Sequence, residues 1–231
     1  MVTTDISERI RTILDRITAA AVRAGRDPAE ITLLAVSKTK PLETVVEAAR
    51  TGLVAHFGEN HVQEGQVKIP AFPSELPARW HLIGHLQRNK ARKAAQLFDV
   101  IESVDSPAIA SVLERVCAET GRGLDVLIEV NSSGEDSKTG SPCSDVPALA
   151  EHVRASCPHL RLCGLMTIGP LGGDERAVRS AFAATRELRD SLRLSADDLP
   201  ALSMGMSGDF EWAIAEGSTE VRVGTSIFGQ R

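Results

Sequence analysis

A lysine follows the first apolar run of the chain, in the segment Ala-Val-Ser-Lys-Thr-Lys-Pro over residues 35–41. If this run is a β-strand, alternation puts Lys38 on the same face as Leu34 and Val36, two residues deeper than Lys40. An amine on an apolar face loses hydration, which lowers its pKa and makes it a nucleophile able to form a Schiff base with a carbonyl group. The other interpretation, an amine that extends past the strand end into water, stays open.

An arginine lies between two valines in the last apolar run. Val221 and Val223 share one face of a strand, so Arg222 lies on the opposite face, with Gly224 beyond it. An inward guanidinium needs a partner, because burying an unpaired charge costs free energy. The sequence leaves two partners open, a bound ligand and an internal ion pair with Glu220 on the same face.

Three further positions offer the donors that a phosphate group accepts. Ser207 follows the seventh apolar run and is a predicted N-cap, which leaves backbone N–H groups available at the start of the next helix. Gly224 and Thr225 follow the last run and add a second loop of small residues. Together they predict a phosphate site, although a Ser-Gly pair by itself is also an ordinary helix start.

Polar groups also end the second and third apolar runs, at Phe-Gly-Glu-Asn-His (57–61) and Trp-His-Leu-Ile-Gly-His-Leu-Gln-Arg-Asn-Lys (80–90), and we expect them to line a pocket. The polar segment 131–140 is either a lid over that pocket or a surface loop, and the role of Lys138 within it is open. Four histidines lie in or beside these segments, but none pairs with another on one helix face, so no metal site is predicted; they are His56, His61, His81 and His85.

The composition excludes several classes of protein. The 231 residues carry 26 Lys and Arg against 31 Asp and Glu, so sequence-independent binding to nucleic acid is not expected, and the basic run over 88–93 is typical of a solvated helix face. No apolar run approaches the roughly 18–20 residues that cross a bilayer, and the first ten residues lack a secretory signal. Four cysteines without a Cys-x-x-Cys pair favour free thiols in the cytoplasm.

A regular scaffold must position these residues. Short apolar runs alternate with helical patterns along the whole chain, after an opening amphipathic helix whose apolar face runs from Ile6 to Ile17. The spacing predicts eight strands, each followed by a helix except the last. They are expected at 31–38, 55–59, 80–83, 100–104, 124–130, 162–168, 202–206 and 221–227.

This order of elements predicts an α/β protein, a single-domain (β/α)8 barrel over residues 1–231 with an extra N-terminal helix. The alternative is a doubly wound open sheet. In such a barrel the loops after the strands meet at one end, where active and binding sites lie. The residues singled out above lie at or just beyond the ends of predicted strands, so we expect them to meet there.

Six segments, taken together, resemble one known family. Three are the segments 35–41, 57–60 and 80–90 quoted above. The others are Gly-Leu-Met-Thr-Ile-Gly (164–169), Ser-Met-Gly-Met-Ser-Gly-Asp (203–209) and Val-Arg-Val-Gly-Thr-Ser-Ile-Phe-Gly (221–229). They occur in order over nearly the whole chain, and on these motifs the chain is identified as a member of the pyridoxal phosphate homeostasis proteins, also called the YggS/PROSC family.

The resemblance implies a TIM barrel of the alanine racemase type that holds pyridoxal 5′-phosphate (PLP) as an aldimine on Lys38, with Arg222 facing the pyridine nitrogen. His61 stands where many relatives have a tyrosine, which leaves the contacts around it open. The other implied contacts are Asn60 and Ile83 with the ring, and Ser207, Gly224 and Thr225 with the phosphate.

The resemblance further implies a carrier that stores PLP and supplies it to apo-enzymes without robust catalysis. Racemases of this type need a second proton-transfer group, a tyrosine from an additional domain of a partner subunit, whereas this sequence has no tyrosine and stops soon after the eighth predicted strand. Two alternatives remain, a PLP-dependent racemase-like enzyme and a Schiff-base aldolase that acts on a sugar phosphate without a cofactor. A monomer is expected, because a barrel of this size buries enough apolar surface by itself.

Overall fold

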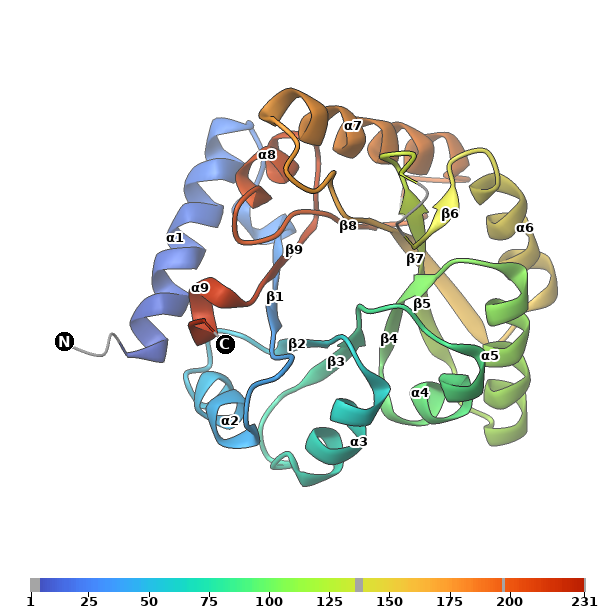
Figure 1. Ribbon diagram of the computed structural model, residues 1–231, viewed down its shortest axis with the longest axis horizontal. Coiled ribbons are helices and arrows are strands. Elements are labelled where there is room, and N and C mark those ends of the chain that lie inside the picture. The colour runs from blue at the N-terminus through green and yellow to red at the C-terminus, as the bar shows by residue number, and fades with distance from the viewer. Residues whose placement is uncertain (1–4, 136–138, 197, 231) are drawn as a thin grey trace.

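Parallel strands form a closed ring in the computed structural model, which describes residues 5–135, 139–196 and 198–230. The strands of the ring are β1 (Thr32–Val36), β2 (His56–Glu59), β3 (Arg79–Leu82), β4 (Val100–Val104), β5 (Leu124–Asn131), β7 (Leu160–Thr167), β8 (Ala201–Ser203) and β9 (Glu220–Val223). Neighbours follow the order β4-β3-β2-β1-β9-β8-β7-β5, and β4 also pairs with β5, which closes the barrel (Figure 1). A short strand, β6 (Ser141–Pro142), pairs with the end of β5.

Helices surround this ring of strands (Figure 1). They are α1 (Ile6–Arg23), α2 (Leu42–Arg50), α3 (Val62–Ala71), α4 (Ala91–Leu97), α5 (Pro107–Thr120), α6 (Val146–Ser156), α7 (Glu175–Leu192), α8 (Phe210–Ala215) and α9 (Thr225–Phe228), with 3-10 turns η1 (Pro28–Glu30) and η2 (Arg88–Lys90). The predicted (β/α)8 barrel with an extra N-terminal helix is confirmed, and the open-sheet alternative is wrong. No helix among the described residues is both long and apolar enough to cross a bilayer.

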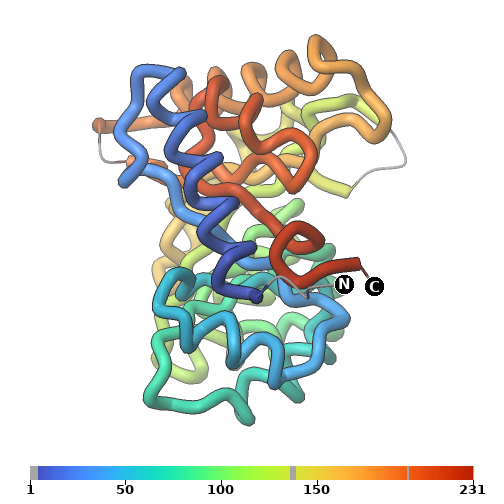
Figure 2. Tube along the Cα trace, turned by 90° about the vertical axis from the view of Figure 1, so that its left-hand side faces the viewer, coloured from blue at the N-terminus to red at the C-terminus, as the bar shows by residue number. Residues whose placement is uncertain are grey.

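The extra helix α1 covers the seam of the barrel. Asp5 is its N-cap and accepts the N–H of Ser7, and the apolar face from Ile6 to Ile17 is buried. The helix packs against α8 and α9, which lie beside it in both views (Figures 1 and 2). Because β1 pairs with β9, α1 joins the first and last parts of the barrel.

Several predicted strands end earlier than expected, and the strand predicted at 202–206 ends at Ser203. β1 ends at Val36, and Lys38 lies in the turn that follows, not on the strand. β9 ends at Val223, and the short helix α9 follows it, so the prediction of a strand to residue 227 without a helix after it is wrong. Ile227 is apolar because it is buried as a helix side chain, and strand alternation could not distinguish the two.

Polar side chains occupy much of the barrel interior. The main apolar core joins the strands to the helices, whereas a small separate cluster consists of strand residues Val100, Leu127 and Met166. Buried polar and charged groups on the strands include His81, Glu102, Ser203, Glu220 and Arg222. Buried groups of this kind need hydrogen-bond partners, and those partners define the site described next.

Candidate functional site

A cavity of about 300 Å³ lies at the carboxyl ends of the barrel strands, and we call it the mouth cavity. Its size suits a small organic ligand. All of the residues that the sequence analysis assigns to a binding site line it; they are Lys38, Asn60, Ile83, Ser207, Arg222, Gly224 and Thr225. The fold therefore brings together loops after five different strands.

Lys38 is half-buried in a tight turn after β1. The N–H of Lys40 donates to the carbonyl of Ser37 (3.1 Å), and Thr39 has a φ of 62°. A positive φ is rare for a β-branched residue, so the surrounding contacts must hold this backbone in place.

Buried charged groups from β2 and α3 hold the Lys38 turn. The amine of Lys68 donates to the carbonyl of Ser37 (2.8 Å) and to Oε1 of Glu59 (2.8 Å), which also accepts the hydroxyl of Ser37 (2.7 Å). Oε2 of Glu64 accepts the N–H of Thr39 (2.6 Å) and a bond from Lys68 (3.2 Å). This cluster was not predicted, although the i,i+4 spacing of Glu64 and Lys68 on α3 is a signal for an ion pair.

The two carboxyl groups of this cluster titrate differently. Burial raises the pKa of Glu59 more than the hydrogen bonds from Lys68 and Ser37 lower it. Burial also acts to raise the pKa of Glu64. The hydrogen bonds from Thr39 and Lys68 outweigh it and hold the pKa of that carboxyl below its ordinary value. The carboxylate that accepts the strained Thr39 N–H is therefore the more readily ionised of the two.

Arg222 is buried beneath the mouth cavity and held by neutral acceptors. Nη1 donates to the carbonyl and hydroxyl oxygens of Ser203 (2.7 Å each), and Nη2 donates to the carbonyl of Thr167 (2.7 Å). No ion pair joins Arg222 to Glu220 in the described part of the chain. Three of the five N–H groups of the guanidinium are therefore bound to neutral acceptors, and the internal ion pair with Glu220 that the sequence left open is wrong.

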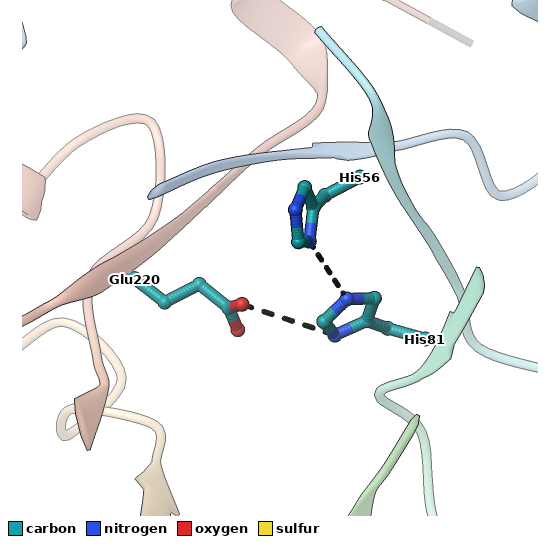
Figure 3. Close-up of side chains that lie close together, drawn as sticks. All are labelled: His56, His81 and Glu220. Atoms are coloured by element: carbon teal, nitrogen blue, oxygen red, sulfur yellow. Dashed lines mark hydrogen bonds and ion pairs between the residues drawn. The ribbon is translucent and has the colours of Figure 1, made fainter. Parts of the chain in front are cut away.

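A chain of hydrogen bonds runs from Arg222 into the barrel. The hydroxyl of Ser203 donates to Oε2 of Glu102 (2.6 Å), and Oε1 of Glu102 lies 2.7 Å from Nδ1 of His81. Nε2 of His81 lies 3.0 Å from Nδ1 of His56. Figure 3 shows His56, His81 and Glu220 converging from β2, β3 and β9. The sequence places these residues far apart, so spacing along one helix could not reveal them.

The groups in this chain influence one another's protonation. Burial would raise the pKa of Glu102, but the hydrogen bond and charge of His81 lower it to about 2. Burial, followed by the charge of His81, lowers the pKa of His56 to about 4. Burial next to Glu102 raises the pKa of Glu220 to about 8. Burial would lower the pKa of His81, but Glu220 and Glu102 raise it.

Small residues surround the other end of the mouth cavity. Ser207 does not cap a helix, because α8 begins at Phe210 and Asp209 is its N-cap, so that prediction is wrong. The side chain of Asp209 instead accepts the N–H of Met206 (2.6 Å), which closes a turn around Ser207. Position 224 favours glycine, because a Cβ there would lie only 3.0 Å from the carbonyl oxygen of Val36.

The loops after β2 and β3 meet beside the cavity. A Cβ on Gly84 would lie 2.2 Å from the carbonyl oxygen of Asn60, so only glycine permits this close approach of the two backbones. His61 is exposed and lines a neighbouring cleft together with His85, outside the mouth cavity. Lys138 lies outside the described residues.

Comparisons with known proteins agree with this fold. The family model for the alanine racemase N-terminal domain matches residues 13–231. The pyridoxal phosphate homeostasis protein of Pseudomonas aeruginosa is 48% identical over 98% of this chain and 96% of that protein. The human protein of the same name is 41% identical over 96% of this chain and 85% of that protein.

Solved structures extend the comparison. PipY of Synechococcus elongatus with PLP bound is 38% identical, has a TM-score of 0.79, and is matched over 94% of this chain and 100% of PipY. An alanine racemase of Clostridium difficile, 12% identical with a TM-score of 0.72 over 97% of this chain and 57% of the racemase, shares the fold. The chain belongs to the alanine racemase N-terminal domain family and, within it, to the pyridoxal phosphate homeostasis proteins.

Proposed function

We propose that this chain binds PLP in the mouth cavity, holds it covalently on Lys38 and supplies it to apo-enzymes as a carrier. The observation that supports this most directly is the meeting of an amine, a guanidinium and small hydroxyl residues in one cavity of about 300 Å³. The PLP-bound structure of PipY, at 38% identity, supports the same ligand.

The donors around the cavity fit the chemical groups of PLP. The amine of Lys38 is suited to condense with the aldehyde, which forms a C=N bond and releases water. Arg222 has five N–H groups, of which three donate to Ser203 and Thr167, so two remain for an acceptor such as the pyridine nitrogen. The remaining assignments are Asn60 and Ile83 beside the ring, and Ser207, Gly224 and Thr225 at the phosphate.

The arginine favours storage over catalysis. PLP supplies an electrophilic aldehyde and an electron-withdrawing ring, and the withdrawal is strongest when the ring nitrogen is protonated. A guanidinium donates N–H groups and has no acceptor, so Arg222 favours an unprotonated nitrogen. The sequence contains no tyrosine, so this chain lacks the phenol that two-base racemisation would use. We therefore propose a carrier without robust catalysis.

We further propose that residues 1–231 form one barrel domain and that the protein acts as a monomer in the cytoplasm. The most exposed large apolar side chains among the described residues belong to five different segments; they are Val22, Val67, Leu171, Leu194 and Met206. The cysteines are free, as expected in a reducing compartment. Light scattering that gives the mass of one chain would support the monomer, and a dimer mass would contradict it.

The test is the visible absorption of protein incubated with PLP and freed of excess, before and after borohydride reduction, followed by peptide mapping. We expect a yellow protein whose cofactor is trapped on Lys38. Lys38→Ala should lose the covalent band and keep the fold, as circular dichroism would show. Lys40→Met should keep the band, because the Lys40 amine binds the carbonyls of Gly229 and Gln230. A colourless protein that takes up no PLP would overturn the proposal.

A further inference from the structure

Three metal-ligating side chains converge inside the barrel, away from the mouth cavity. His56 and Glu220 are the first residues of β2 and β9, whereas the mouth cavity lies at the opposite, carboxyl ends of the strands. One donor atom from each of His56, His81 and Glu220 lies within 4.8 Å of the other two. Figure 3 shows the carboxylate of Glu220 directed toward the imidazole of His81, whose other ring nitrogen faces His56. We call these three residues the inner triad.

The spacing of the imidazole nitrogens matches a metal site. Nδ1 of His56 and Nε2 of His81 lie 3.0 Å apart. Two nitrogens bound to one tetrahedral zinc ion at 2.0–2.1 Å lie about 3.3 Å apart. A shift of a few tenths of an ångström would therefore convert the shared hydrogen bond into two metal bonds.

One oxygen of the third group of the triad lacks a hydrogen bond. Oε1 of Glu220 is buried without a hydrogen bond, and the residue is 8% exposed. Its other oxygen, Oε2, lies 3.8 Å from Nδ1 of His81, too far for a hydrogen bond. A buried unsatisfied carboxylate oxygen needs an explanation, and a bound ion is one.

An outer carboxylate completes the arrangement. Glu102 is fully buried and accepts at Nδ1 of His81 (2.7 Å), which directs the other ring nitrogen toward His56. Metal-binding histidines commonly donate their second N–H to a carboxylate in this way. The neighbouring guanidinium of Arg79 is paired with Asp125, so its positive charge is offset.

We propose that the inner triad binds a divalent transition metal of the zinc class, with a water molecule in the fourth position. Two imidazoles and a carboxylate are donors that zinc accepts, and three protein ligands leave one site open. Binding displaces two protons into solvent, the one shared by the two imidazoles and, where the Glu220 carboxyl group is protonated, the one that this group carries. The ion would tie β2, β3 and β9 together, so it would stabilise the barrel and need not take part in PLP chemistry.

The experiment uses the full chain without PLP, stripped with EDTA and dialysed, and then titrated with ZnCl2 in a calorimeter. We expect one ion per chain and a rise in the melting temperature. Co²⁺ in place of Zn²⁺ should give the visible absorption of a tetrahedral site with nitrogen and oxygen ligands. His56→Gln and Glu220→Gln should each weaken binding by about a hundredfold or more, and Glu102→Gln by about 10–100-fold.

Two controls separate the triad from surface binding. His159→Gln removes another histidine–carboxylate pair, with Glu114 at 2.7 Å, and should leave the titration unchanged. Alkylation of the accessible thiols, Cys143 and Cys163, should also leave it unchanged. No uptake at one equivalent, or uptake that survives in a folded His56→Gln/Glu220→Gln double variant, would overturn the proposal. Because PLP is absent throughout, the result is independent of the proposed carrier function.

Discussion

Arg222 controls the electronic state of the ring in the proposed complex, because its guanidinium stays charged and can only donate. Three bonds to Ser203 and Thr167 leave its remaining N–H groups available at the cavity. Arg222→Glu would put a carboxyl group there, which favours a protonated ring nitrogen. We expect the visible band of the PLP-loaded variant to shift and to depend on pH differently from the parent.

Absorption spectra recorded over a pH series check this prediction, with circular dichroism to verify the fold. Arg222→Gln serves as the comparison, since an amide still donates but carries no charge. An unchanged spectrum in both folded variants would mean that Arg222 only joins Ser203 to Thr167 and does not contact the ring.

Glu64 positions the Lys38 turn from outside. Its Oε2 accepts the N–H of Thr39, the residue with the positive φ. Glu64→Ala removes that acceptor, so the turn should relax and the affinity for PLP should fall by roughly tenfold, the scale of one hydrogen bond to a charged group. Equilibrium titration with PLP, followed by absorption, measures the change.

The matched control for Glu64 is Glu30→Ala, which removes another i,i+4 carboxylate, one paired with Arg26 at 3.1 Å. It should leave PLP affinity unaltered. If both variants bind PLP like the parent, the turn holds its shape without Glu64. If both lose affinity equally, the loss reflects general destabilisation instead of the contact with Thr39.

At the scale of elements, ion pairs join strands at the amino-terminal end of the barrel, opposite the mouth cavity. Asp125 on β5 binds Arg161 of β7 (2.7 and 2.5 Å) and Arg79 of β3. Burial would raise the pKa of Asp125, but the bonds and charges of Arg161 and Arg79 outweigh it and hold the pKa below its ordinary value. The ionised form is therefore favoured in the folded chain.

A carboxyl group with a lowered pKa stabilises the fold above its unfolded pKa, and this stability is lost as pH falls through the folded value. Asp125→Asn should therefore cost about 1 kcal/mol at neutral pH, a small figure because Arg161 is exposed and screened. The difference from the parent should shrink below about pH 4. Urea unfolding at several pH values measures it, and a difference that grows in acid would contradict the assignment.

The order of elements was predictable because each strand and helix carries its own periodicity. The ends of the strands were less predictable. Lys38 and Ile227 each stand an even number of residues after an apolar strand residue, so alternation included them in the strands, although both lie beyond the strand ends. Ser207 illustrates a third limit, because the helix begins only after Asp209, whose side chain accepts the N–H of Met206 and closes a turn around Ser207. Local patterns therefore located the elements well and their last residues poorly.

At the scale of the molecule, the barrel brings together residues that no local pattern connects. The mouth cavity was predictable, because its lining residues lie at or just beyond the ends of strands and barrels collect these ends on one side. The inner triad and Glu102 were not, since they come from four strands and their meeting depends on register. His56 faces His81 because β2 and β3 are adjacent, and Glu220 reaches them across the interior.

The proton-transfer groups that the barrel places around the proposed cofactor determine whether catalysis is expected. Racemisation needs a proton acceptor on each face of the substrate, and Lys38 supplies one amine at the mouth cavity while the sequence offers no tyrosine for the other. We expect PLP-loaded protein to form D-alanine from L-alanine no faster than PLP in buffer. Chiral chromatography of the products measures this rate. A faster rate that Lys38→Ala abolishes would identify an enzyme, because the same amine would then be moving a proton as well as holding the cofactor.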